Sequence, residues 1–151
     1  MRIALFDFWT ANEDRNANNA NMMYDVAKGL LFSIDYGCIF NTATFDYPLS
    51  QLTYTDTILW SDIFRHLVQN QRTETIYTII KRLKEEYAQI IIKCNFITNQ
   101  LCEDIPQEWN VPKPIIKEKL HQLFDEQWIT KTWNNFTEFL NENINYESIK
   151  I

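Results

Sequence analysis

Residues 73–98 read TETIYTIIKRLKEEYAQIIIKCNFIT, and this stretch decides the fold class. Its apolar side chains recur at steps of three and four residues, which is the period of an amphipathic helix. Thr73 is a suitable N-cap, and charged residues fill the opposite side of the helical wheel. We therefore predict one long helix over residues 73–98, with these side chains turned inward: Ile76, Ile79, Ile80, Leu83, Tyr87, Ile90, Ile91, Cys94 and Ile97.

The composition also favours helices. Gly29 and Gly37 are the only glycines in 151 residues, so the tight turns of a β protein lack their usual residue. Hydrophobic residues make up 46% of the chain, which is enough to fill a core. We expect one domain over residues 1–151, an all-α bundle of about five or more helices.

The stretch NEDRNANNANMM, residues 12–23, contains five asparagines. On a helical wheel several of them share one side, while alanines, methionines and leucines recur on another, so we interpret the asparagines as the solvated face of a helix over residues 11–35. Thr10 and Glu13 have the spacing of a capping box at its start. The segment before it, residues 3–9, fits either a short N-terminal strand or a buried helical turn.

Three more helices are expected further along the chain. Residues 55–69 should turn Leu59, Ile63 and Leu67 inward, together with Trp60 and Phe64. Three prolines make residues 100–114 a loop, and Pro114 suits the first turn of a helix that continues through residue 124. The last helix, residues 131–142, should bury Trp133, Phe136, Phe139 and Leu140.

Charge and cysteine usage limit the partners. The net charge is −6, and an acidic surface repels phosphate backbones but attracts a basic protein, so we expect no direct nucleic-acid partner. No segment approaches the roughly 18 uncharged apolar residues of a membrane span. Cys38, Cys94 and Cys102 lack the spacing of a metal site and suit reduced thiols. We expect a cytoplasmic protein with no membrane partner, no metal site and no cofactor.

Catalytic patterns are sparse. Asp62 lies four residues before His66 on one helix face, where a carboxylate could poise an imidazole for acid–base chemistry, although an ordinary surface ion pair has the same spacing. A carboxylate metal site would require several of Asp7, Asp35, Asp46 and Asp56 to converge in space. With two glycines, the chain has no glycine-rich phosphate loop. We assign no catalytic residue.

The surface offers candidates for partner binding. Acidic residues and a tryptophan occur together twice, once in the proline-bounded loop and once before the last helix, and aromatic anchors ringed by acids are typical of sites for basic partners. The opposing interpretation is that the tryptophans fill the core and the acids stay solvated. Our candidates are Glu103, Asp104, Glu108, Trp109, Asp125, Glu126 and Trp128, with Glu13 and Asp14 as second choices.

A small, acidic, aromatic-rich helical chain of this kind resembles, in overall character, the immunity proteins of bacterial contact-dependent growth inhibition and other polymorphic toxin systems. The resemblance implies an antitoxin, not an enzyme, that binds a cognate protein toxin and occludes its active site or substrate groove. A basic nuclease would be the matching toxin, because its phosphate-binding surface complements an acidic patch.

Two alternatives belong to other functional classes. One is a small cytosolic enzyme with a site around Asp62 and His66. The other is a helical adaptor or regulatory protein that binds a host protein. Replacement of His66 distinguishes the enzyme from the two binding proteins, because only the enzyme would lose its activity.

Overall fold

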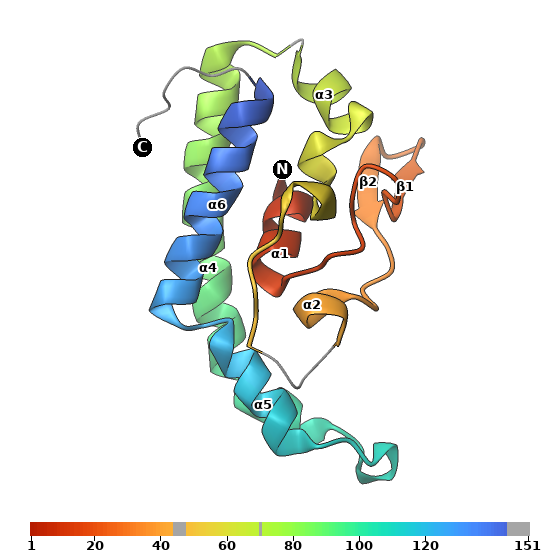
Figure 1. The fold of residues 1–151 in the computed structure, drawn as a ribbon, viewed down its shortest axis with the longest axis vertical. Helices are drawn as coiled ribbons and strands as arrows, with labels where there is room; N and C mark the ends of the chain where they lie inside the picture. The colour runs from red at the N-terminus through yellow and green to blue at the C-terminus, as the bar shows by residue number, and fades with distance from the viewer. Residues whose placement is uncertain (44–47, 70, 145–151) are drawn as a thin grey trace.

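The computed structural model describes residues 1–43, 48–69 and 71–144. These residues form a mainly helical fold with one small antiparallel sheet near the N-terminus, which confirms the expected fold class (Figure 1). The α-helices are α1 (Arg2–Thr10), α2 (Ile39–Ala43), α3 (Asp62–Gln69), α4 (Thr73–Asp104), α5 (Lys113–Gln122) and α6 (Glu126–Ile144). The strands are β1 (Met22–Asp25) and β2 (Leu30–Ser33), and three 3-10 turns are η1 (Tyr54–Asp56), η2 (Ile58–Trp60) and η3 (Gln107–Trp109).

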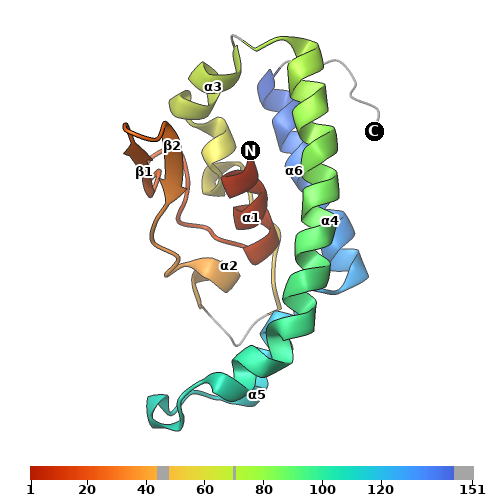
Figure 2. The same ribbon diagram turned by 180° about the vertical axis from the view of Figure 1, so that it is seen from behind.

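The core lies where α1 meets the two long helices α4 and α6. Phe8 of α1 makes edge-to-face contacts with Phe136 and Phe139 of α6, and Tyr87 of α4 stacks on Trp133 of α6. These rings are buried, as the last-helix pattern predicts, and α1 is held against the helices on one side (Figures 1 and 2). Burial of large aromatic side chains of this kind supplies most of the stabilisation of a helical core.

Residues 3–9 are helical, which settles the choice between a strand and a helical turn in favour of α1. The helix is short but has buried side chains around most of its circumference, including Leu5, Phe8 and Trp9. The indole N–H of Trp9 donates to the carbonyl of Leu123 (2.8 Å), and that of Trp128 donates to the carbonyl of Trp9 (2.9 Å). These reciprocal bonds fasten α1 to the junction of α5 and α6.

The predicted helix over residues 11–35 is wrong. Thr10 is the last residue of α1, its hydroxyl donates to the carbonyl of Phe6, and Ala11 adopts a left-handed conformation (φ 50°) that ends the helix. Residues 11–21, hereafter the asparagine loop, contain no regular element, and the hairpin of β1 and β2 follows. Asparagine side chains explain the error, because they hydrogen-bond to nearby backbone and compete with helix formation.

The hairpin is a two-stranded sheet in which Met22 pairs with Ser33 and Asp25 with Leu30. Gly29 occupies the turn with a positive φ of 64°, a conformation that side chains rarely adopt, and the Asp25 carboxylate accepts hydrogen bonds from the amides of Ala27 and Lys28. The low glycine content argues against hairpin turns, but one glycine and one aspartate are sufficient to form this one.

The other predicted helices are present, but the helix predicted over residues 55–69 begins only at Asp62, after the 3-10 turns η1 and η2, and the buried faces differ from those predicted. In α3 the buried residues are Phe64 and Val68, whereas the predicted Ile63 and Leu67 are half exposed. In α4 the stripe of Ile76, Ile80, Leu83, Tyr87 and Ile91 is buried as predicted. Three predicted members of that stripe are exposed, and the helix continues through Asp104, six residues past its predicted end. Those three are Ile79, Ile90 and Ile97.

Candidate functional site

A buried ion pair anchors the asparagine loop to α1. The Nε of Arg15 lies 2.9 Å from a carboxylate oxygen of Asp7, and the two side chains are 0% and 1% exposed. The amide of Asn12, which is also buried, donates to the other oxygen of Asp7 (2.9 Å). Burial raises the pKa of Asp7 to about 6, although Asn12 and Arg15 both act to lower it. A buried pair of this kind is costly to form, which suggests a role beyond stability.

Arg15 joins the two ends of the hairpin. Its Nη1 donates to the carbonyl of Asn21, just before β1, and to the carbonyl of Ile34, just after β2 (3.0 Å). The backbone amide of Ile34 also donates to the carbonyl of Asn21 (2.8 Å). The guanidinium carbon lies 5.2 Å from the centre of the Tyr36 ring. One buried side chain therefore fixes where the chain enters and leaves the hairpin.

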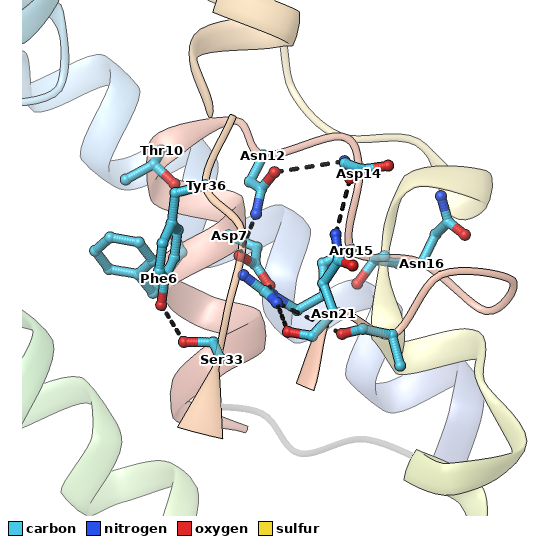
Figure 3. A network of polar contacts seen from close by, with 12 residues as sticks. Phe6, Asp7, Thr10, Asn12, Asp14, Arg15, Asn16, Asn21, Ser33 and Tyr36 are labelled. Atoms are coloured by element: carbon cyan, nitrogen blue, oxygen red, sulfur yellow. Dashed lines mark hydrogen bonds and ion pairs between the residues drawn. The ribbon is translucent and has the colours of Figure 1, made fainter. Parts of the chain in front are cut away.

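Asp14 is half-buried beside this anchor (Figure 3). Both of its carboxylate oxygens accept hydrogen bonds. The amide of Asn19 donates to one oxygen (3.0 Å) and the amide of Asn21 donates to the other (2.8 Å). Asn16 in turn accepts hydrogen bonds from the backbone amides of Asn18 and Asn19 (2.9 and 3.1 Å). The asparagines thus build the loop and orient one carboxylate.

A second carboxylate, that of Asp35, follows the hairpin immediately after Ile34. Asp35 is exposed, has a positive φ of 57°, and accepts a hydrogen bond from the amide of Gly37 (3.0 Å) through one oxygen. Beside it, burial raises the pKa of the Cys38 thiol, and the charges of Asp14, Asp35 and Glu13 raise it further. The charges of carboxylates from the asparagine loop and from the residues after the hairpin thus act on the same thiol.

Two side-chain oxygens in this region have no partner among the described residues. Because the Asn19 nitrogen is bound to Asp14, its carbonyl oxygen is free, and so is the second carboxylate oxygen of Asp35. Hard oxygen donors are what Mg²⁺ prefers, and Mg²⁺ commonly uses only one or two protein ligands beside substrate phosphates. The described residues contain no cluster of three His, Cys, Asp or Glu side chains suited to a metal. The oxygens of Asn19 and Asp35 could therefore hold a metal only together with further ligands, such as the phosphates of a substrate.

Comparison with known families gives this arrangement a context. A family model described as HipA-like kinase matches residues 1–139. The chain belongs to the HipA-like kinase family. Searches of curated proteins and of solved structures found no match.

Membership of a kinase family corrects several expectations. The resemblance to immunity proteins is wrong, and so is the prediction of an antitoxin that neutralises a toxin, because the match places nearly the whole chain in a family of kinases. The prediction that the chain is not an enzyme is contradicted by the same match. Among the described residues, no helix is long and apolar enough to cross a membrane.

The predicted partner-binding residues are dispersed over the fold. Most of them are exposed, at the end of α4, in η3 and at the start of α6, whereas Trp128 is buried in the core and bound to Trp9. Only Glu13 and Asp14 lie at the site described above. The exposed residues are Glu103, Asp104, Glu108, Trp109, Asp125 and Glu126.

The carboxylates considered for chemistry also separate. On the exposed surface of α3, Asp62 pairs with Arg65 (3.5 Å), and His66 has Gln69 as its neighbour. Asp56 accepts a hydrogen bond from the amide of Thr53 in the cap of η1 (2.8 Å). Asp7 and Asp35 both lie near the asparagine loop, one as its buried anchor and one at its surface, while Asp46 lies outside the described residues.

Sequence reasoning missed Asn19, Arg15 and the role of Asp35. Two signals for them were present. Asp14 and Asn19 are five residues apart, and Asp35-Tyr36-Gly37 has the form D-x-G. Protein kinases use the patterns H-R-D-x-x-x-x-N and D-F-G, with the same spacing between the first aspartate and the asparagine. The interpretation of the loop as a helix obscured both signals.

Proposed function

We propose that this chain carries the phosphoryl-transfer site of an ATP-dependent kinase, built from Asp14, Asn19 and Asp35. The observation that carries the proposal is the position of Asp14. Its carboxylate is held by Asn19 and Asn21 in the loop that precedes the hairpin, and Asp35-Tyr36-Gly37 follows the hairpin. Loop, hairpin and D-x-G occur here in the order in which kinases carry their catalytic aspartate and metal-binding aspartate.

In this proposal Asp14 accepts the proton of the attacking hydroxyl group. The two asparagine amides fix the orientation of the Asp14 carboxylate. The carboxylate is therefore already oriented toward the attacking hydroxyl group before the reaction begins. The free oxygens of Asn19 and Asp35 would hold Mg²⁺, which neutralises the charge of the transferred phosphoryl group. Arg15, buried beneath them, holds the carbonyls on either side of the hairpin and so keeps Asp14 and Asp35 in register.

The residues around Asp14 depart from the H-R-D pattern of kinases. Asn12 and Glu13 stand where H-R-D has histidine and arginine, and Arg15 follows Asp14 instead of preceding it. The buried arginine instead pairs with Asp7 of α1 through its Nε, while its Nη2 has no hydrogen-bond partner among the described residues. This difference concerns how the loop is anchored and leaves the spacing from Asp14 to Asn19 intact.

The proposal is tested by transfer of the labelled γ-phosphoryl group from ATP, with protein purified gently from its native cells so that bound components are retained. We expect transfer that requires Mg²⁺ and that Asp35→Asn or Asn19→Ala reduces by about 10²–10⁴-fold. Asp62→Asn and His66→Ala are matched controls on α3 and should retain full activity. Activity that survives Asp35→Asn but is lost with His66→Ala would contradict the proposal.

A further inference from the structure

A cavity of about 190 Å³ lies between α1 and α4, where α1 runs alongside the longer helix (Figure 2). Both helices contribute apolar side chains to its lining, and charged or polar residues surround its opening. The apolar lining consists of Leu5, Phe6, Trp9, Leu83, Tyr87 and Ile90. We call this space the α1–α4 cavity.

The α1–α4 cavity has the size and the walls that suit a single aromatic ring. Apolar cavities of roughly 150 Å³ bind benzene-sized molecules. Trp9 already makes edge-to-face contacts with Phe6 and with Tyr87, each at a centroid distance of 6.2 Å. A ring bound here would extend this aromatic cluster, because edge-to-face pairs add to the free energy of apolar burial.

The opening of the cavity carries a surplus of positive charge. Arg2 donates to both carboxylate oxygens of Glu86 (2.7 and 2.8 Å), and Arg82 donates to one of them (2.9 Å). Two arginines thus share one carboxylate. Lys93 is exposed at the same opening, and its side chain forms no ion pair with any described residue. On a chain of net charge −6, this local surplus favours a ligand with a negative group.

A hollow of about 250 Å³ beside Trp133 offers similar groups but suits such a ligand less well. Lys84 already lies over the Trp133 ring, 5.7 Å from its centre, and Glu85 adds a negative charge to the lining. Lys81 is the remaining cation there. The α1–α4 cavity therefore combines an apolar space with an unpaired lysine more completely than this hollow does.

We propose that the α1–α4 cavity binds a small aromatic carboxylate, with the ring among Phe6, Trp9 and Tyr87 and the carboxylate at Lys93. The ring supplies apolar burial, and Lys93 selects the charge of the ligand. The Phe6 ring also contacts Tyr36, which follows Asp35 (5.6 Å between centroids), so this site adjoins the proposed phosphoryl-transfer site without sharing its polar residues. The inference goes beyond the proposed function, because binding requires no phosphoryl transfer.

The test follows the tryptophan indole N–H resonances of the ¹⁵N-labelled full chain as 3-phenylpropionate is added. Trp9 lines the cavity, whereas Trp109 lies in η3, outside it. We expect a saturable shift of the Trp9 resonance, an unmoved Trp109 resonance and a dissociation constant of about 0.1–1 mM. The neutral probe 3-phenyl-1-propanol, which carries the same ring, should bind about threefold to tenfold more weakly.

Lys93→Gln tests the charge at the opening. It should weaken 3-phenylpropionate by about threefold to tenfold and leave the binding of the neutral probe unchanged. Lys81→Gln is the matched control, since it removes the same charge from another exposed position of α4 that lines the hollow beside Trp133.

Ile90→Trp tests the cavity itself. Ile90 lines the cavity and is 47% exposed, so a larger side chain there fills the space without replacing a core residue. Both probes should bind at least about tenfold more weakly. Ile92→Trp is the control, because Ile92 is 72% exposed on the same helix and lies outside the cavity lining. Circular dichroism melts check that each variant folds.

Each contrary outcome overturns a stated part of the proposal. A Trp9 resonance that does not move with millimolar probe overturns the site, and so does equal weakening by Ile90→Trp and Ile92→Trp. Loss of binding with Lys81→Gln but not with Lys93→Gln, or a shift of the Trp133 resonance alone, overturns the location. Neutral and charged probes that bind equally well overturn the assignment of a carboxylate. None of these measurements depends on phosphoryl transfer, so failure of the proposed function leaves them unaffected.

Discussion

Phe136 in α6 and Arg15 in the asparagine loop are both fully buried, but they stabilise their surroundings by different means. Phe136 packs among aromatic rings, where burial of apolar surface supplies the free energy and tolerates many sequences. Arg15 is held by one carboxylate and by backbone carbonyls, an arrangement with little tolerance for substitution. The helices need only fill space, whereas the loop needs these particular groups, and that difference marks the loop as the functional part.

Asp7→Ala should cause the largest loss of stability among the substitutions that compare the two regions. It leaves the charge of Arg15 buried without a partner, and the expected loss is about 3–5 kcal/mol in the free energy of unfolding. Urea denaturation at neutral pH measures it. The pair Asp7→Leu with Arg15→Met removes both charges and should recover much of the stability but none of the phosphoryl transfer. Recovery of activity in that double variant would show that the pair has no positioning role.

Leu140→Ala tests the contribution of the helical core. The side chain is 0% exposed, and its truncation should cost about 2–5 kcal/mol through lost burial and the cavity left behind. Below the unfolding transition, however, phosphoryl transfer should stay close to that of the unchanged chain, because Leu140 belongs to α6 and makes none of the hydrogen bonds that hold Asp14. A large fall in activity at full folding would mean that the two regions are coupled more tightly than we infer.

Asp7 should also make stability depend on pH. Its pKa is about 6 in the folded chain because of burial and is lower in the unfolded chain, so the folded state binds the proton more tightly. The contribution of Asp7 is therefore fully present below pH 4 and is lost as the pH rises through 6, by roughly 1–3 kcal/mol. Denaturation at pH 4 to 7 measures the slope, and Asp7→Asn should flatten it. An unchanged slope in that variant would assign it to other groups.

The smallest effect expected is that of Asn21→Ala. It removes one of the two hydrogen bonds to Asp14, worth about 1 kcal/mol in a half-buried setting. Phosphoryl transfer should fall by about fivefold to tenfold. Asn18→Ala is the control, since the exposed Asn18 side chain makes no contact with Asp14. Equal losses in both variants would mean that the orientation of the Asp14 carboxylate has no effect on the rate.

The long helices could be predicted from the sequence because apolar residues that recur at steps of three and four indicate a helix with one buried face. Ile76, Ile80 and Leu83 recur at helical steps and are buried, and the last helix buries its predicted aromatic residues. Periodicity cannot fix the width of the buried stripe, which depends on neighbouring elements. Ile79 was therefore predicted to be buried, but no neighbouring element covers it and its side chain is exposed.

The site could not be predicted in the same way. Asn12, Asn16 and Asn19 fit the polar face of a helix in the sequence, but in the structure they bond to Asp7, to the loop backbone and to Asp14. The pairing of Arg15 with Asp7 requires the chain to turn back after α1, because residues eight positions apart in one helix are separated by about two turns. The usual relation between polarity and burial is reversed in this region, because Phe32 of the hairpin is exposed and Arg15 of the asparagine loop is buried. Spacing motifs, not hydropathy, held the usable information.

The most direct test of the central claim is a single-turnover measurement of phosphoryl transfer by Asp14→Asn, made with native preparations and beside urea denaturation of the same samples. The substitution keeps the shape of the side chain and removes its ability to accept a proton. We predict a rate lower by about 10²–10⁴-fold and a free energy of unfolding lower by about 1–3 kcal/mol, because one of the two asparagine amides would then face an amide NH2 group instead of an oxygen. An unchanged transfer rate in a folded Asp14→Asn variant would contradict the claim that the asparagine loop performs the chemistry.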